Sequence, residues 1–207
     1  MRNFLTSRHK RYWERRQIDW RQAYWNPEHP HREVIVRALK GVKFNSIIEV
    51  GCASGANLQK IKKAFPHVEI GGIDISSDAI KTAIEIFGDR AAVLEVSDVK
   101  EIFLSDKSAD VVLSDMCLIY LDPLNIYKAI QEIKRVARNN ILLVEFHHKS
   151  WFKRLALRIF AGYNSYNYEK LLKRHGFYDI EFYKLTEADW PTGEPQKTFG
   201  YVISARI

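Results

Sequence analysis

A turn built from small residues is the feature of this sequence that points most directly to chemistry. Residues 46–50 form an apolar run too short for a helix, and Gly51, Ala53 and Gly55 follow with little or no side chain. A backbone of this kind can approach a ligand closely. The next apolar run ends at Asp74, about twenty residues further on, where nucleotide-type sites usually hold a ribose diol. The combination predicts a nucleoside-containing cofactor on the first half of the chain.

The elements that would position these residues alternate between strand and helix. The strands that we expect are Ile47–Val50, Glu69–Ile73, Ala92–Glu95, Asp110–Ser114 and Asn140–Phe146. The helices between them are Ala56–Phe65, Ser77–Phe87 and Pro123–Ala137. Strands separated by single helices predict a doubly wound, parallel α/β sheet with right-handed crossovers.

The rhythm changes after Phe146. Residues 150–160 form an amphipathic stretch, whose apolar side we expect to pack against the core, with contact to a membrane surface as the alternative. A helix over Tyr168–His175 would end at Gly176. Two strands follow, Tyr178–Leu185 and Phe199–Ile207, which must pair antiparallel or lie apart because no helix is expected between them.

Length and composition are those of one globular domain. The chain has 207 residues, of which 46% are hydrophobic and 28% charged, and no apolar run reaches the roughly 20 residues of a membrane span. The N-terminus lacks the apolar core of a secretory signal, and two cysteines are too few for a disulfide framework. These observations favour a cytoplasmic protein without stable membrane insertion.

The charge is concentrated at the N-terminus. Residues 1–45 contain 11 Lys or Arg and 4 Asp or Glu, which accounts for the whole formal net charge of +7. A helix is expected up to Trp25, Pro27 and Pro30 would interrupt it, and a second helix would begin near His31. We therefore divide the chain into a basic and aromatic helical cap at 1–43 and a core at 44–207, with a lid-like insertion at about 148–168.

The chain resembles the class I S-adenosylmethionine-dependent methyltransferases from Phe44 to Ile207. The segments that carry the resemblance are Glu49–Gly55, Gly72–Ser76, Val96–Val99, Asp110–Asp115, Glu132–Val136 and Leu171–Phe177. The resemblance implies a Rossmann-like, seven-stranded sheet, mostly parallel with an antiparallel C-terminal strand and helices on both faces. It also implies S-adenosyl-L-methionine as the cofactor.

The resemblance further assigns a set of cofactor-binding residues. Asp74 would bind the ribose hydroxyls, Asp98 the adenine amine, and Glu49 would orient the loop and the cofactor's ammonium group. The full set is Glu49, Gly51, Cys52, Ala53, Ser54, Gly55, Asp74, Ile75, Asp98, Val99 and Ser114. The alternative for Asp74 and Asp98 is that each caps the following helix, and for the cysteines that they only fill space.

Catalytic candidates lie just beyond the expected strands, because ligands bind at the carboxyl ends of parallel strands. Asp115, Tyr120 and His147 are these candidates, with His147 or Asp115 favoured as the proton acceptor if one is needed. Residues expected to contact the substrate or form the lid are Tyr24, Trp25, His29, His31, His148, Trp151 and Tyr163. No metal site is expected.

Three functions remain open at this stage. The first is methyl transfer to oxygen or nitrogen of a small molecule. The second is an RNA or protein methyltransferase that uses the basic, aromatic N-terminal arm to bind phosphates and stack bases. The third is a nucleotide-binding oxidoreductase or a non-catalytic module. The segment from Ser114 to Cys117 lacks the signatures of DNA-base methylation, and the sequence does not indicate an oligomeric state.

Overall fold

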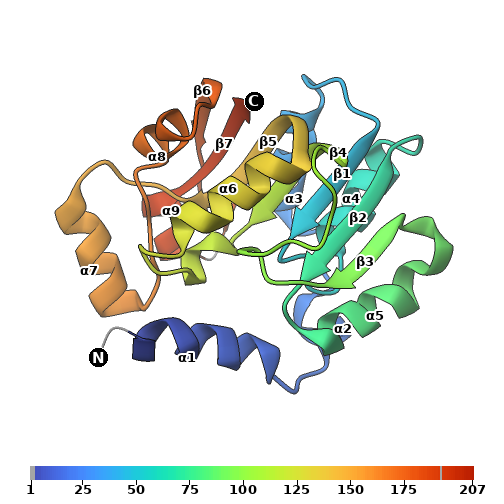
Figure 1. Cartoon of the computed structure of the whole chain (residues 1–207), viewed down its shortest axis with the longest axis horizontal. Helices are drawn as coiled ribbons and strands as arrows, with labels where there is room; N and C mark the ends of the chain where they lie inside the picture. The colour runs from blue at the N-terminus through green and yellow to red at the C-terminus, as the bar shows by residue number, and fades with distance from the viewer. Residues whose placement is uncertain (1–2, 192) are drawn as a thin grey trace.

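A twisted sheet of seven strands forms the centre of the molecule (Figure 1). The computed structural model describes the backbone of residues 3–191 and 193–207, and within these ranges the side chains from residue 9 onward. The strands are β1 (Ser46–Val50), β2 (Glu69–Asp74), β3 (Val93–Val96), β4 (Ala109–Asp115), β5 (Ala137–Phe146), β6 (Tyr178–Lys184) and β7 (Gly200–Arg206). Their order across the sheet is β3-β2-β1-β4-β5-β7-β6.

Strand pairing confirms the expected fold class. The pairs among β1 to β5 are parallel, and β7 is antiparallel to both of its neighbours, β5 and β6. Val50 on β1 lies opposite Ile73 on β2 and Ser114 on β4. The carboxyl ends of these three strands therefore meet at one edge of the sheet, where the residues that follow them can share a site.

Helices cover both faces of the sheet. Among the described residues the α-helices are α1 (Asn3–Glu14), α2 (Trp20–Tyr24), α3 (Pro30–Leu39), α4 (Ala56–Ala64), α5 (Ser77–Phe87), α6 (Ile126–Val136), α7 (Trp151–Ala161), α8 (Tyr168–Arg174) and α9 (Glu194–Phe199). Single-turn 3₁₀ helices follow α5 at Gly88–Arg90 and β4 at Leu118–Tyr120.

Two apolar clusters hold these layers together. Side chains of α3, α4 and α5, among them Ile35, Leu58 and Ile80, pack in one cluster with Ile47 of the sheet. Side chains of α6 and α8 pack in the other cluster. Because α3 is a full member of the first cluster, a boundary at residue 43 would separate it from a core that it helps to build.

The N-terminal segment differs from the single helix expected up to Trp25. Residues 15–19 interrupt it, and a new helix begins at Trp20. The side chain of Asp19 accepts a hydrogen bond from the backbone N–H of Gln22 at 2.9 Å, which is the contact of a helix N-cap. Asp19 therefore favours a second helix start and so a change of chain direction between α1 and α2.

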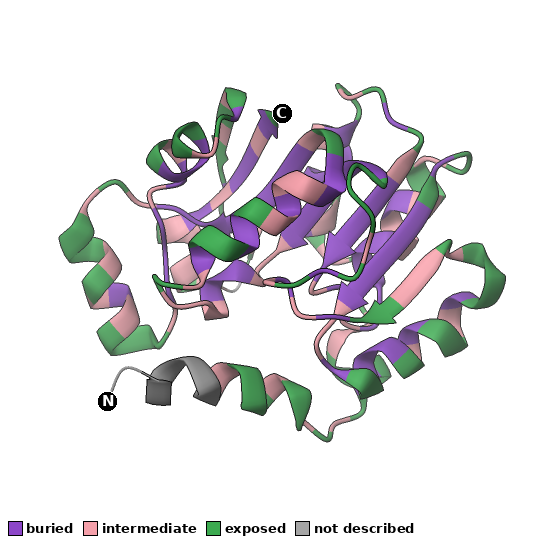
Figure 2. Ribbon diagram, in the orientation of Figure 1, coloured by how far each residue is buried: buried purple, intermediate pink, exposed green. Residues whose placement is uncertain are grey.

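Two further expectations about the C-terminal half were wrong. The loop between the last two strands contains a short helix, α9, which has Pro195 in its first turn. The apolar side of the stretch at residues 150–160 does not pack against the core: of α7, Leu157 alone is buried, and most of the helix surface is exposed (Figure 2).

Candidate functional site

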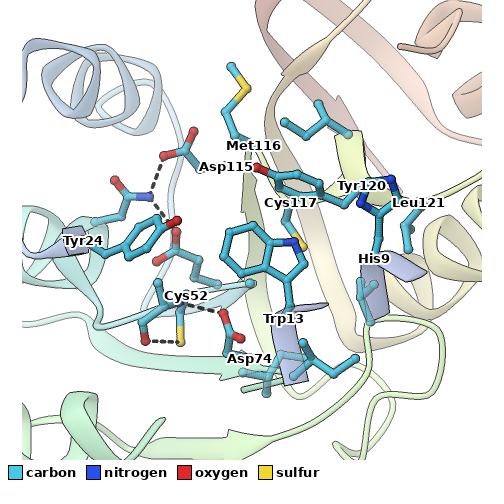
Figure 3. Close-up of a pocket in the computed structure, with 18 of the residues that line it drawn as sticks. His9, Trp13, Tyr24, Cys52, Asp74, Asp115, Met116, Cys117, Tyr120 and Leu121 are labelled. Carbon is cyan, nitrogen blue, oxygen red and sulfur yellow. Dashed lines mark hydrogen bonds between the residues drawn. The ribbon is translucent and has the colours of Figure 1, made fainter. Parts of the chain in front are cut away.

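A cavity of about 450 Å³ lies at the edge of the sheet where β1, β2 and β4 end (Figure 3). Its floor comes from the loop after β1 and from the ends of β2 and β4. The turn after β3 forms one wall, and side chains of α1, α2 and the start of α3 cover it. Segments far apart in the sequence thus meet around one space of the size that small ligands occupy.

The loop after β1 is held open toward this cavity by its backbone. Gly51 and Gly55 have φ angles of +73° and +84°, and Ala53 has +48°. Gly51 also has no room for a side chain, because a Cβ there would lie 2.5 Å from Sγ of Cys117. The amides of Gly51 and Cys52 donate to the carbonyl of Ile73 at 2.8 and 3.0 Å, which ties the loop to β2.

Asp74 ends β2 and lines the cavity. Its carboxylate accepts hydrogen bonds from the amides of Ala53 and Ser76, both at 2.9 Å, so it joins the two loops that flank the site. Burial raises the pKa of Asp74 above its ordinary value. The side chain that caps α5 is that of Ser76, which accepts from the amide of Ala79, so Asp74 is not the cap.

Asp98 lies in a tight turn after β3 and also lines the cavity. No helix begins at Val99, so the helix-cap alternative for Asp98 is wrong. The carboxylate accepts from the amide of Lys100 at 3.0 Å and from Nζ of Lys10 at 3.1 Å. Although burial acts in the opposite direction, the hydrogen bond from Lys100 and the charges of Lys100 and Lys10 lower the pKa of Asp98.

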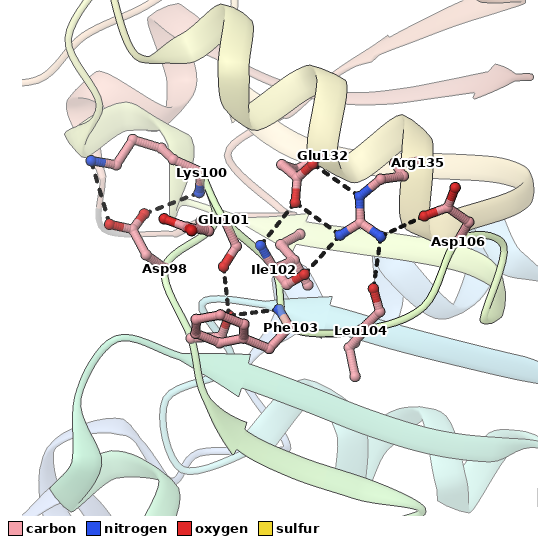
Figure 4. A network of polar contacts seen from close by, with 10 residues as sticks. Asp98, Lys100, Glu101, Ile102, Phe103, Leu104, Asp106, Glu132 and Arg135 are labelled. Carbon is pink, nitrogen blue, oxygen red and sulfur yellow. Dashed lines mark hydrogen bonds and ion pairs between the residues drawn. The ribbon is translucent and has the colours of Figure 1, made fainter.

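Arg135 of α6 anchors the loop that carries Asp98 (Figure 4). Its guanidinium donates to the backbone carbonyls of Ile102 and Leu104, each at 2.7 Å. It also forms ion pairs with Glu132 and Asp106, each at 2.8 Å. These contacts bind the loop after β3 to a helix of the core, so they fix the wall of the cavity from outside.

A buried polar network lies behind the loop after β1. Nδ2 of Asn57 donates to Glu49 at 2.6 Å and to Asp115 at 2.9 Å, while Arg32 donates to Oδ1 of Asn57. Burial raises the pKa of Glu49 to about 8. One oxygen of Glu49 and one of Asp115 are buried without a hydrogen-bond partner among the described residues. A ligand that donates hydrogen bonds would satisfy them.

Three residues form a chain of hydrogen bonds along the cavity. Nε2 of His31 lies 2.8 Å from Oδ2 of Asp115, and Nδ1 of His31 lies 2.6 Å from Nδ1 of His29. The His31 ring also stacks on Trp190 at 4.2 Å. Burial is the main cause that lowers the pKa of His29. For Asp115, His31 and Arg32 lower the pKa, although burial acts to raise it.

Aromatic side chains from the N-terminal helices cover the cavity. Trp13 of α1 packs edge-on against Tyr120 at 5.0 Å, and in Figure 3 it lies between Tyr120 and Asp74. Trp20 is almost fully buried and lies 5.1 Å from Tyr24. Burial raises the pKa of Tyr120 far above its ordinary value, so its hydroxyl stays protonated.

The structure brings most of the sequence-derived candidates together. Those that line the cavity are Glu49, Gly51, Cys52, Ala53, Asp74, Ile75, Asp98, Val99, Asp115, Tyr120, Tyr24, His29, His31 and Tyr163. Those that do not are Ser54, Gly55, Ser114, Trp25, His147, His148 and Trp151.

His147 and His148 lie on the far side of β5 from the cavity. Nδ1 of His147 accepts from the amide of Tyr168 at 3.1 Å, and its ring packs on Phe182 and Tyr201. Burial is the main cause that lowers the pKa of His147 to about 4. Nδ1 of His148 accepts from the amide of Ser150. His147 is therefore a neutral packing residue, and neither ring reaches the proposed site.

The other candidates outside the cavity have local structural contacts. The hydroxyl of Ser114 donates to Glu145 at 2.7 Å, and a Cβ on Gly55 would face the ring of Phe87. Trp25 packs edge-on against Phe87, whereas Ser54 is fully buried and its hydroxyl has no hydrogen-bond partner among the described residues. Trp151 stacks on its neighbour Phe152 at the surface.

Several residues that contribute to the site were not among the individual site candidates. Those that line the cavity are Lys10, Trp13, Trp20, Arg32, Asn57, Trp190 and Gln196. Arg32 and Asn57 could have been found from their positions in the sequence, because Arg32 follows the candidate His31 directly and Asn57 lies two residues after the candidate Gly55. Trp190 could not, since it reaches His31 only through the fold.

Among residues 3–191 and 193–207, no group of three or more His, Cys, Asp or Glu has an arrangement that could hold a metal ion. Within the same described part, no helix is both long and apolar enough to cross a bilayer.

Known proteins resemble both the sequence and the fold. Residues 47–140 match a family model described as a methyltransferase domain. Malonyl-[acyl-carrier protein] O-methyltransferase 1 of Ilyobacter polytropus is 33% identical over 90 residues, which cover 44% of this chain and 33% of that protein. The corresponding enzyme of Hahella chejuensis is 30% identical over 76 residues, 37% of this chain and 27% of its own. The chain thus spans about a third of the length of these relatives.

A solved structure matches along nearly the whole chain. The N-methyltransferase NodS of Bradyrhizobium japonicum WM9, in complex with S-adenosylhomocysteine, has a TM-score of 0.68 and 17% identity. The match covers 98% of this chain and 97% of that one. At this identity the likeness establishes the fold, and the sequence matches concern the half that carries the Gly-rich loop, Asp74 and Asp98.

Proposed function

We propose that the chain is a class I S-adenosylmethionine-dependent methyltransferase and that it transfers a methyl group from this cofactor to oxygen or nitrogen of a small molecule. The match of residues 47–140 to a methyltransferase domain and the fold support this proposal. The observation that carries the proposal is the shared cavity. A loop of positive-φ residues and the carboxylates of Asp74 and Asp98 line the same space at adjoining strand ends.

The residues present fit an adenosyl sulfonium compound. Asp74 retains lone pairs for two hydroxyl donors of a ribose, and Asp98 faces the same cavity with an acceptor for an amine. The unpartnered oxygens of Glu49 and Asp115 suit the ammonium group of a methionine moiety. Arg32, which lines the cavity beside them, suits its carboxylate. When bound, the cofactor supplies an activated methyl group with a good leaving group.

The cap would align the acceptor and keep water out. Trp13, Tyr24 and Tyr120 enclose the cavity from α1, α2 and the turn after β4. An enclosed, aromatic wall holds a small acceptor in one orientation and removes competing water. The protein's contribution to the rate is then largely orientation.

His29 is the residue that we assign as proton acceptor. Both ring nitrogens of His31 are engaged, whereas no hydrogen bond within the described part of the chain occupies Nε2 of His29. If Asp115 accepts from Nε2–H of His31, then Nδ1 of His31 accepts from Nδ1–H of His29, which leaves Nε2 of His29 free to take a proton. This tautomer gives up the long contact of 3.4 Å in which Nδ1 of His29 accepts from the backbone N–H of His31. The lowered pKa keeps His29 neutral at neutral pH. In this hydrogen-bonded series, Asp115 and His31 are positioning residues that orient the ring of His29.

Many of the residues that would select the acceptor lie outside the segment that matches the family model. The curated relatives are named for a malonyl-[acyl-carrier protein] substrate, but the family match ends at residue 140. Residues 9–32 and 163–196, which supply the cover of the cavity, lie beyond it. A malonyl thioester therefore enters the tests as one acceptor among several.

The geometry favours a small acceptor over RNA. An RNA-binding arm needs exposed aromatic rings for stacking. Trp20 is buried and Trp13 faces the cavity, so these two rings pack inward instead. Tyr12 of α1 is 51% exposed, but Arg16 lies over its ring at 5.0 Å. The exposed cations of α1 are thus accompanied by one exposed tyrosine instead of a series of stacking rings.

Binding and turnover together test the proposal. Calorimetry with S-adenosylmethionine is expected to show one-site binding, and the same titration with NAD is expected to show no heat. A labelled-methyl assay against separate pools of metabolites, malonyl-acyl carrier protein and RNA then identifies the acceptor class. Failure to bind the sulfonium compound would refute the proposal, and label in RNA alone would replace the small acceptor by the second hypothesis.

A further inference from the structure

Helix α7 presents its apolar side away from the protein. The exposed fractions are 57% for Trp151, 65% for Phe152, 45% for Leu155, 64% for Ile159 and 87% for Phe160. Leu157 is the one buried residue of the helix. A surface helix normally buries its apolar side, so this helix has its large apolar side chains on the solvent side.

The apolar residues form one continuous face. At about 100° per residue, the five exposed apolar side chains fall within an arc of about 180°, and Leu157 lies on the opposite side of the helix. Lys153 and Arg158 stand at the two borders of the arc. No Asp or Glu occurs from residue 146 to 168. An apolar face with aromatic rings and bordering cations is the composition of a helix that lies in a membrane interface.

A cationic cavity adjoins this face. It measures about 380 Å³ and lies between α6, α7 and α8, where Arg154, Arg158, Lys170 and Arg174 line it. No Asp or Glu of the described residues lines it, and none of the four cations takes part in an ion pair of that part of the chain. The hydroxyl of Ser165, a residue only 5% exposed, also lines the cavity and is buried without a hydrogen-bond partner.

Leu155 belongs to both features, since it lines the cavity and is part of the exposed face. An anion with an attached apolar chain would satisfy both at once. Phosphate oxygens suit several arginines and a hydroxyl donor, and hydrocarbon suits the face of α7. An apolar protein partner would account for the face but would leave four unpaired cations around the cavity.

We propose that α7 and the adjoining cavity dock the protein on a bilayer surface that contains anionic phospholipids. The cavity receives a phosphate headgroup, and the apolar face of α7 lies at the level where headgroups meet acyl chains. The formal net charge of +7 attracts the molecule to such a surface from a distance. This surface is separate from the cavity that the sheet edge forms, so the inference stands independently of the proposed activity.

Vesicle sedimentation tests the inference on the full chain. The protein is mixed with vesicles of phosphatidylcholine alone or of phosphatidylcholine with phosphatidylglycerol, at low and high salt. We expect binding only to the vesicles with phosphatidylglycerol, weakened by salt. The double variant Ile159→Ser with Phe160→Ser is expected to bind at least about tenfold more weakly, and Arg158→Gln and Arg174→Gln about fivefold more weakly each.

Matched variants elsewhere on the surface serve as controls. Ile84→Ser with Phe103→Ser removes two exposed apolar residues from other elements, and Lys81→Gln and Lys40→Gln remove single exposed cations. These variants are expected to bind vesicles as the unmodified protein does. Thermal unfolding verifies that each variant is folded.

Four results would overturn the inference. One is sedimentation that does not depend on phosphatidylglycerol. Another is equal loss of binding in the control variants and in the variants of α7. The third is self-association in ultracentrifugation that needs Ile159 and Phe160 and occurs without vesicle binding, because the apolar face would then serve a second copy of the chain. The fourth is full release of the protein from the vesicles by millimolar inorganic phosphate, because the cavity would then bind a free anion in solution instead of a lipid headgroup.

Discussion

At the residue scale, Asp74 combines a structural and a ligand-facing position. Its carboxylate joins the loop after β1 to the start of α5 through two backbone amides. It also lines the cavity at the point where the sequence predicted a ribose contact. A single carboxylate of this kind fixes the shape of the site and still has lone pairs to offer.

We expect Asp74→Ala to weaken binding of S-adenosylmethionine by about 100-fold or more, since two hydrogen bonds to a charged group are lost at about 1.5 kcal/mol or more each. Calorimetry measures the affinity. Asp74→Asn serves as the control, because it keeps the size and one acceptor oxygen, and a smaller loss is expected. Equal affinities of Asp74→Ala and the unmodified protein would exclude a cofactor contact at this residue.

The proton-acceptor role of His29 predicts a particular pH profile. Because burial lowers its pKa, the neutral form that can accept a proton persists below the ordinary value of 6.5, and turnover should fall only at more acidic pH. His29→Gln is expected to reduce kcat by about 100-fold and to abolish this acidic limb, with little change in cofactor affinity. An unchanged limb in the variant would assign the titration to another group.

At the element scale, a helix on one face of the sheet holds the wall of the cavity. Arg135 reaches from α6 to two carbonyls and an aspartate of the loop after β3. Glu145 has a similar task at the end of β5, where its side chain accepts from the hydroxyl of Ser114 and from the amides of Cys117 and Leu118. Neither residue lines the cavity, yet each positions residues that do.

Arg135→Lys is expected to weaken cofactor binding about tenfold without contact to the ligand. Lysine keeps the charge but lacks the planar set of donors that serves several acceptors at once. The free energy of unfolding should fall by about 1–2 kcal/mol. Lys134→Arg, a change at the neighbouring position, is the control. A large stability loss with unchanged affinity would mean that the loop keeps its place without Arg135.

Glu145 predicts a pH dependence of stability. Burial raises its pKa in the folded state to about 8 from an ordinary 4.5, so the neutral form is favoured by folding. Its stabilising contribution is complete below pH 4.5 and is lost as the pH rises through about 8. Glu145→Gln, which keeps the acceptor oxygen, should therefore flatten the decline in urea-measured stability over this range. The decline will not vanish, because Glu49 titrates in the same direction.

At the scale of the whole molecule, the N-terminal segment closes a site that the sheet builds. Lys10 and Trp13 of α1 contact Asp98 and Tyr120, which both line the cavity. None of the described side chains of α1 belongs to the three apolar clusters of the core. The described side chains of α1 therefore cover the site without being part of the apolar core.

Deletion of residues 1–16 tests this separation. We expect the fold to persist, with a small change in the unfolding temperature, while affinity for the cofactor falls about tenfold because an aromatic contact and the cover are lost. If the full chain shifts the mobility of RNA in a gel, the deletion variant is expected to lose that shift. A collapse of the unfolding transition would show that α1 is required by the core after all.

The sequence by itself determined the alternation of strands and helices, the order of the core elements and the strand ends that carry Asp74 and Asp98. These features follow from local pattern, because hydrophobic periodicity and turn residues can be identified within a short stretch of sequence. The sequence also predicted the Gly-rich loop, because small residues between an apolar run and a helical pattern indicate a turn that lets the backbone approach a ligand closely.

Tertiary structure alone decided which side chains meet. His31 contacts Asp115 across 84 positions, and Trp190 stacks on His31 from the last loop, so no local signal announces either contact. His147 stands one residue beyond β5, and only the packing of Phe182 and Tyr201 on it shows that it faces away from the cavity. The sequence predicted an apolar and a basic side for the stretch that forms α7. Which side meets the core depends on neighbours in space, and here the apolar side does not pack against the core.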